Sequence, residues 1–129
     1  MIKTVVCMGI VLKNDKVLMI KRKKKEGTLS WAFPGGKLEE NESCEECCAR
    51  EVFEETGVRC NVDYKIKEKI HPDTKVKIIY FKCEALPNQN IIINEDECDT
   101  VLWVERNKVS ELVTSNFDDD VRLEIESQV

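Results

Sequence analysis

The sequence predicts an α/β sandwich, folded as one domain over residues 1–129. Three observations lead to this fold class: apolar, β-branched runs that are typical of strands, one long helical segment with clear start and stop signals, and a shorter helical pattern near the C-terminal end. Strands that surround a long helix pack with it in layers around one core. A chain of this length can bury one such core and is too short for two.

The strands are predicted from apolar runs that end at turn residues. Residues 4–13 read as a buried strand, and residues 16–23 read as its hairpin partner. In the second strand Leu18, Ile20 and Arg22 share one face, because side chains alternate along a strand. The remaining predicted elements are strands at 62–70, 76–85 and 101–104, a turn at Pro34, Gly35 and Gly36, and short helices at 108–113 and 118–127.

The long helix is predicted over residues 44–56. Ser43 followed by Glu46 is a capping-box pattern, in which the hydroxyl and the carboxylate each satisfy a backbone N–H that the first helical turn leaves unpaired. Gly57 predicts the end of the helix, because glycine readily adopts the left-handed conformation that closes one.

Composition and charge argue against several classes of protein. Hydrophobic residues make up 42% of the chain and charged residues 35%, as in a folded globular protein. The net charge of −5 argues against a nucleic-acid duplex as partner, and no apolar run approaches the roughly 20 residues of a membrane span. The first residues lack the pattern of a signal peptide. We therefore expect a cytoplasmic monomer or homodimer without a membrane partner.

Seven cysteines are an unusual number for a chain of this kind. Cys7 and Cys83 lie inside apolar runs, where a reduced thiol packs as a small hydrophobic group. Cys44 and Cys47 form a C-x-x-C, the one possible metal or redox cluster. No second pair and no neighbouring histidine completes a zinc site, so packing is the favoured interpretation.

Three glutamates of the predicted helix form a candidate metal site. At 100° per residue, Glu51, Glu54 and Glu55 fall within a sector of about 100° on one helical turn. Carboxylates this close repel one another unless a cation lies among them or water surrounds them. Their hard oxygens suit Mg²⁺, or Mn²⁺, bridged to substrate phosphates. The alternative for such a triplet alone is a solvated acidic face.

The surrounding segment favours the metal site. Residues 36–58 carry nine specified residues at fixed spacing: Gly36, Glu42, Arg50, Glu51, Val52, Glu54, Glu55, Gly57 and Val58. A chance match is on the order of 10⁻⁹ per starting position. This pattern resembles the Nudix box in full, and the lead-in from Trp31 to Lys37 is similar to that of MutT-type members. After Val58 the resemblance is weaker.

The resemblance implies an α/β/α sandwich with a mixed β-sheet. It also implies Mg²⁺ ligands at the Gly35 carbonyl, Glu51, Glu54 and Glu55, with Arg50 forking onto Glu42 or a neighbouring glutamate. The catalytic residues that it implies are Glu54, Arg50 and a later acid, of which we favour Glu97 over Glu95, Asp96 and Asp99. The substrate-binding residues that it implies are Arg22, Lys37 and Asn116, although Asn116 also reads as an ordinary loop residue.

The function that follows is a Mg²⁺-dependent pyrophosphohydrolase. The leading substrate is a nucleoside triphosphate, canonical or oxidised, cleaved by water to the monophosphate and pyrophosphate. The enzymatic alternative is a nucleoside diphosphate derivative: ADP-ribose, a sugar nucleotide, a dinucleoside polyphosphate or an RNA 5′ end. Two further classes are a nucleotide-sensing module without turnover, which the intact carboxylates disfavour, and a thiol-based redox or zinc protein.

Overall fold

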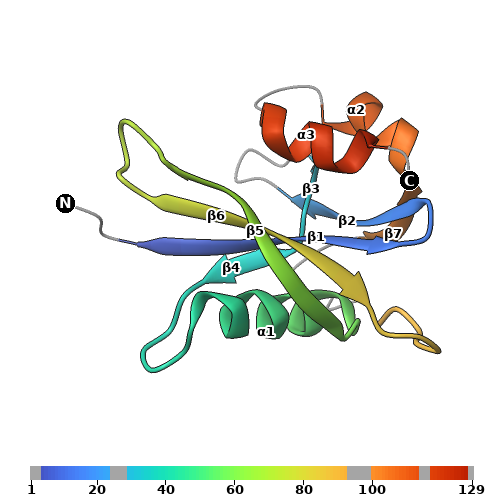
Figure 1. The fold of residues 1–129 in the computed structure, drawn as a ribbon, viewed down its shortest axis with the longest axis horizontal. Coiled ribbons are helices and arrows are strands. Elements are labelled where there is room, and N and C mark those ends of the chain that lie inside the picture. The colour runs from blue at the N-terminus through green and yellow to red at the C-terminus, as the bar shows by residue number, and fades with distance from the viewer. Residues whose placement is uncertain (1–3, 24–28, 93–99, 114–116, 128–129) are drawn as a thin grey trace.

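A computed structural model describes residues 4–23, 29–92, 100–113 and 117–127 (Figure 1). Its strands are β1 (Val5–Lys13), β2 (Lys16–Lys23), β3 (Leu29–Ala32), β4 (Gly35–Lys37), β5 (Cys60–Ile70), β6 (Lys77–Ala85) and β7 (Thr100–Glu105). Its helices are α1 (Cys44–Thr56), α2 (Val109–Leu112), which follows a 3₁₀ turn at Arg106–Lys108, and α3 (Asp119–Glu126). None of these described helices is long and apolar enough to cross a membrane.

The strands form one mixed sheet. Its path runs β3-β2-β1-β6-β5, with β4 paired to β1 and β7 paired to β2. The β1–β6 pair is parallel, from Val5 opposite Lys77 to Leu12 opposite Glu84. The other pairs are antiparallel. The predicted hairpin, the long helix and the three later strands are confirmed to within two residues at each end. Strand β3 was not predicted.

The sheet lies between two helical layers, as the sandwich prediction requires. Figure 1 shows α1 on one face of the sheet and α2 with α3 on the other. Under α1 the core joins Cys7 and Val11 of β1 to Cys48 and Val52 of the helix. Under α3 a second cluster contains Ile10, Leu12, Val17, Met19, Phe33, Val109, Val121 and Ile125. Burial of both strand faces explains why the β1 sequence is almost continuously apolar.

The turn predicted at Pro34, Gly35 and Gly36 is wrong for the two glycines. They form the short strand β4, with Gly35 opposite Met8 and Gly36 opposite Cys7. Neither has a positive φ; among the described glycines only Gly57 does. A Cβ atom on Gly35 would lie 2.8 Å from the Cα of Met8, so glycine is needed here for close approach to β1 rather than for turning.

The predicted ends of α1 are confirmed. The Ser43 hydroxyl accepts the Glu46 N–H at 3.0 Å, and the Glu46 carboxylate accepts the Ser43 N–H at 2.7 Å. Gly57 closes the helix in the left-handed conformation at φ 76°, and its N–H donates to the Phe53 carbonyl. Both ends of α1 are therefore fixed, and with them the direction in which each glutamate points.

Candidate functional site

The predicted glutamates lie on the last two turns of α1, facing β4 and the end of β2. Their side chains differ in exposure to solvent: Glu54 is 53% exposed, Glu51 is 18% exposed and Glu55 is 2% exposed. Three acids with the same chemistry therefore have three different environments. Only the buried one requires a counter-charge from the protein on grounds of desolvation.

Glu55 receives its partners from two strands. The Gly35 N–H donates to Glu55 Oε1 at 2.8 Å, and the Arg22 guanidinium forms an ion pair with Glu55 Oε2. The β2 alternation predicted that Arg22 shares a face with Leu18 and Ile20. The structure confirms it, because both apolar residues belong to the core beneath α1.

Glu51 packs directly against Gly36. A Cβ atom on Gly36 would lie 2.8 Å from Glu51 Oε1 and closer still to the other carboxyl atoms. Gly36 therefore provides the space in which the Glu51 carboxylate lies, between the helix and β4. This close contact gives the first glycine of the motif a physical reason for being glycine.

Arg50 organises the cluster. Its Nε and Nη2 donate to the two Glu42 oxygens at 3.0 and 2.8 Å, the bidentate geometry that arginine forms with carboxylates. Its Nη1 donates to Glu51 at 2.8 Å and to Glu54 at 3.1 Å, and Nη2 also reaches the Lys37 carbonyl at 3.1 Å. Arg50 thus fixes three carboxylates and the end of β4. The catalytic role predicted for Arg50 stays a prediction.

The contact between Arg50 and Glu42 also shifts the pKa of each of the two residues. Hydrogen bonds from Arg50, with one from the Glu39 N–H, lower the pKa of Glu42 to about 2. The same carboxylate raises the pKa of Arg50 above its usual range, so the arginine stays charged. The Glu42 carboxylate is therefore ionised at neutral pH, where it holds the arginine in place.

The donor set fits a divalent cation by its chemistry and charge. Five glutamates, at 39, 42, 51, 54 and 55, form ion pairs with two arginines, so their anionic charge exceeds that of the arginines by three. As placed, no three His, Cys, Asp or Glu side chains within the described ranges surround a single point. The carboxylates of Glu51 and Glu54 are directed to Arg50, and that of Glu55 is directed to Arg22 and Gly35.

The other predicted site residues divide into two groups. Lys37 ends β4 beside the cluster, with its side chain exposed. Glu97 and Asn116 lie outside the described residues, as do the acids at 95, 96 and 99. Their roles remain predictions.

Four of the cysteines in the described ranges pack in the core, which agrees with the favoured interpretation. Cys7, Cys47, Cys48 and Cys83 are fully buried, and Sγ of Cys48 lies 3.7 Å from Sγ of Cys83. Within the C-x-x-C, the Cys47 thiol donates to the Gly36 carbonyl at 3.6 Å. Burial raises the pKa of Cys47 to about 11, so this thiol stays protonated at neutral pH.

Sequence reasoning missed an aromatic cavity on the opposite face of the sheet. Its volume is about 140 Å³, and its lining includes Met8, Phe33, Tyr80 and Phe117. The Phe33 and Phe117 rings are 6.2 Å apart at 46°. Met8 lies opposite Gly35 in the β1–β4 pair, so the cavity and the glutamate cluster adjoin the same two strands. The available signal was Phe33, two residues before Gly35.

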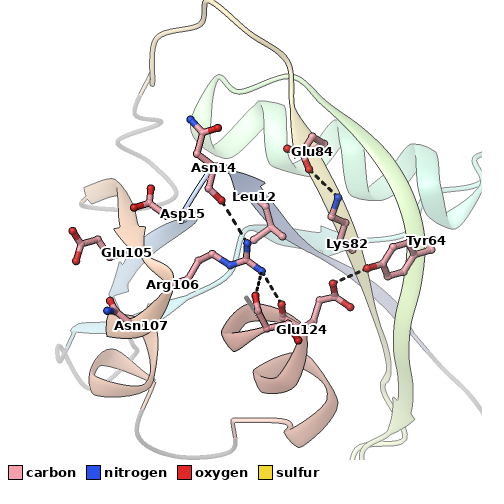
Figure 2. Close-up of a pocket in the computed structure, with 11 residues that line it drawn as sticks. Leu12, Asn14, Asp15, Tyr64, Lys82, Glu84, Glu105, Arg106, Asn107 and Glu124 are labelled. Carbon is pink, nitrogen blue, oxygen red and sulfur yellow. Dashed lines mark hydrogen bonds and ion pairs between the residues drawn. The ribbon is translucent and has the colours of Figure 1, made fainter. Parts of the chain in front are cut away.

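Figure 2 shows a larger cavity, of about 810 Å³, at the hairpin end of β1 and β2. Several of its polar side chains have structural partners: Arg106 donates to carbonyls at the end of α3, Lys82 pairs with Glu84, and Tyr64 donates to Glu124. Arg22 lies at the other end of β2, about 20 Å away at the rise of a strand. This cavity is therefore separate from the glutamate cluster.

Fold and site together define an α/β/α protein with a carboxylate cluster built on one capped helix. The NUDIX domain family model matches residues 3–123, and the chain belongs to this family. A MutT-like protein of Streptomyces ambofaciens is 34% identical over 103 residues, which are 80% of this chain and 64% of that protein. The nucleoside triphosphatase NudI of an Enterobacter species is 30% identical in an alignment 125 residues long, which covers 85% of this chain and 86% of that protein.

The fold is also that of solved structures. A NUDIX hydrolase from Nitrosomonas europaea superposes with a TM-score of 0.83 at 21% identity, covering 98% of this chain and 72% of that chain. The chain spans less than two thirds of the MutT-like relative, 64% of its length.

Proposed function

We propose that this protein is a Mg²⁺-dependent pyrophosphohydrolase that cleaves a nucleoside triphosphate, canonical or oxidised, to the monophosphate and pyrophosphate. The observation that carries the proposal is the Arg50-centred cluster, in which Arg50 holds Glu54 and holds Glu51 beside Gly36. The similarity to a protein named nucleoside triphosphatase, over 86% of that protein, supports the triphosphate as substrate class.

In this proposal Glu51, Glu54, Glu55 and the Gly35 carbonyl would hold Mg²⁺, or Mn²⁺ in its place. The ion would neutralise negative charge on the phosphate oxygens. Arg22 and Lys37 extend from the ends of β2 and β4 to bind and orient the phosphates. Water attacks one phosphorus, a phosphoanhydride P–O bond breaks, and a carboxylate receives the proton of the water. The candidates for that base are Glu54 and Glu97.

The aromatic cavity supports a single nucleotide as substrate. Phe33, Tyr80 and Phe117 offer ring faces and edges on which a base can stack. A volume of about 140 Å³ is small beside the roughly 300–1,000 Å³ of pockets that enclose whole drug-sized ligands. We propose that it receives the base while the phosphates extend toward Gly35, and that Asn116 contacts the base edge.

A substrate panel with Mg²⁺ tests the proposal. Triphosphates, including oxidised guanine nucleotides, are compared with ADP-ribose, sugar nucleotides, dinucleoside polyphosphates and capped RNA, and pyrophosphate and phosphate are measured separately. We expect pyrophosphate from at least one triphosphate at higher kcat/KM than any diphosphate derivative. If ADP-ribose alone is hydrolysed, the protein is a hydrolase of nucleoside diphosphate derivatives and not of triphosphates. If no compound is hydrolysed, the protein is a nucleotide-binding module without turnover.

A further inference from the structure

Two roles meet at Arg22. In the proposed function it binds substrate phosphate. In the structure its guanidinium is paired with Glu55, one of the carboxylates proposed to hold the divalent cation. A cation at that carboxylate and a guanidinium on it would compete for the same oxygens, since both are attracted by the one negative charge.

The hydrogen bonds of Arg22 suit exchange better than those of Arg50. Nε, Nη1 and Nη2 of Arg50 all donate to protein acceptors. For Arg22 the bond to Glu55 comes from Nη2, while Nε is buried and has no hydrogen-bond partner among the described residues. An orphaned buried donor is unfavourable, which partly offsets the gain from the ion pair. The Arg22 side chain is also 39% exposed, so it has solvent on one side into which to move.

Glu55 cannot remain without a counter-charge. It is 2% exposed, and the Gly35 N–H that it accepts is a dipole rather than a full charge. A buried carboxylate that loses its cationic partner is strongly destabilising. The departure of Arg22 is therefore most favourable when another cation takes its place.

We propose that Arg22 is an exchangeable counter-ion of Glu55, displaced from that carboxylate by the divalent cation and thereby released to bind phosphate. This inference rests on the proposed function, because it takes Glu55 as a ligand of the cation. Its consequence is coupling: the cation makes Arg22 available to phosphate, and phosphate on Arg22 frees Glu55 for the cation. By linkage each ligand strengthens the other by the same factor.

Metal affinity without nucleotide gives the first test. Arg22→Gln removes the competing charge and keeps a polar side chain, so Mn²⁺, followed by electron paramagnetic resonance, should bind more tightly, on the order of tenfold. A merely structural role predicts weaker binding, because a disturbed site holds metal less well. Lys21→Gln is the matched control. The Lys21 amine of the wild type lies 5.4 Å from the centre of the Trp31 ring, and the variant should bind Mn²⁺ as the wild type does.

Pyrophosphate alone gives the second test. In the wild type, Mg²⁺ should strengthen pyrophosphate binding, and Arg22→Gln should lose most of that increase while Lys21→Gln retains it. Unchanged or weaker Mn²⁺ binding in Arg22→Gln, or coupling equal to that of the wild type, would overturn the inference.

The wild-type protein provides a measurement that does not depend on how a variant folds. The Arg22 Nε–H signal in a ¹⁵N spectrum should shift as Mg²⁺ is added without nucleotide. A signal unchanged at saturating Mg²⁺ would refute the exchange even if hydrolysis is observed. Absence of both Mg²⁺ binding and hydrolysis in the wild type would instead remove the proposed function, and the inference with it.

Discussion

The carboxylate of Glu51 lies against Gly36 so closely that a methyl group on that glycine would be 2.8 Å from Glu51 Oε1 and nearer to the remaining carboxyl atoms. The atoms that a side chain would meet belong to the far end of the Glu51 side chain, which can rotate away at the loss of its hydrogen bond from Arg50. Substitution at Gly36 therefore displaces Glu51 at little cost in stability. At Gly35 the nearest atoms include the Met8 Cα, 2.8 Å away, and the β1 backbone cannot yield so easily.

The two neighbouring glycines thus predict opposite outcomes. Gly36→Ala should fold with nearly the wild-type melting temperature and lose activity by about 10²-fold, since a displacement of about 1 Å in a positioned group has that effect. Gly35→Ala should lower the free energy of unfolding by about 1–3 kcal/mol through overpacking. Calorimetry and nucleotide hydrolysis on both variants check this pair. An active Gly36→Ala protein would show that the position of Glu51 is not critical.

Glu54 is the member of the cluster best suited to a charge-neutralising test. Because its side chain is 53% exposed, Glu54→Gln should change the free energy of unfolding by no more than about 0.5 kcal/mol. Hydrolysis should fall by about 10²–10⁴-fold if Glu54 is the base or a metal ligand. Glu45→Gln, an exposed acid on the first turn of the same helix, is the control and should retain activity. Full activity in Glu54→Gln would contradict the assigned site.

The local features of this site could be predicted from sequence, because neighbouring residues determine them. Ser43 and Glu46 start the helix and Gly57 ends it, whatever the rest of the chain does. Once those ends are fixed, helical geometry places Glu51, Glu54 and Glu55 in one sector.

The partners of those residues are tertiary and could not be predicted in the same way. That Glu55 would be the buried acid, paired with Arg22, depends on the packing of β2 and β4 against α1. Strand β4 has only three residues and contains two glycines, a composition that favours turns when read alone. The contact between Phe33 and Phe117 joins segments more than eighty positions apart.

The Arg50–Glu42 pair predicts a pH dependence of stability. The pKa of Glu42 falls from 4.5 to about 2 on folding, so between those values the unfolded state binds more protons. The pair therefore stabilises the protein fully above pH 4.5, and this contribution is lost as the pH falls toward 2. Urea unfolding of the wild type and Glu42→Gln should give a gap in stability at pH 6 that closes near pH 2. Glu40→Gln, an exposed acid in the same loop, should show no such closing gap.

Arg106 predicts a purely structural effect. Its guanidinium donates to the carbonyl of Glu124 at 3.0 Å (Figure 2). It also donates to the carbonyls of Ile125 at 2.7 Å and Ser127 at 3.0 Å, so it satisfies acceptors that the end of α3 leaves unpaired. Arg106→Ala should lower the free energy of unfolding by about 1–3 kcal/mol, and Arg106→Lys should recover only part because it lacks the planar fork. Hydrolysis below the melting temperature should be unchanged in both variants. A loss of activity in folded Arg106→Lys would mean that the 810 Å³ cavity takes part in function.

The buried thiols predict slow chemical modification. Burial raises the pKa of Cys47 to about 11 and that of Cys7 higher still, so at pH 8 about one Cys47 in a thousand is a thiolate. Both side chains are also fully inaccessible in the folded protein. Iodoacetamide labelling with mass spectrometry should therefore modify the half-buried Cys44 before Cys7 and Cys47, which should react only on unfolding. Labelling in guanidinium chloride is the control and should modify all three. Rapid native modification of Cys47 would contradict the packing role and would return the C-x-x-C to consideration as a redox site.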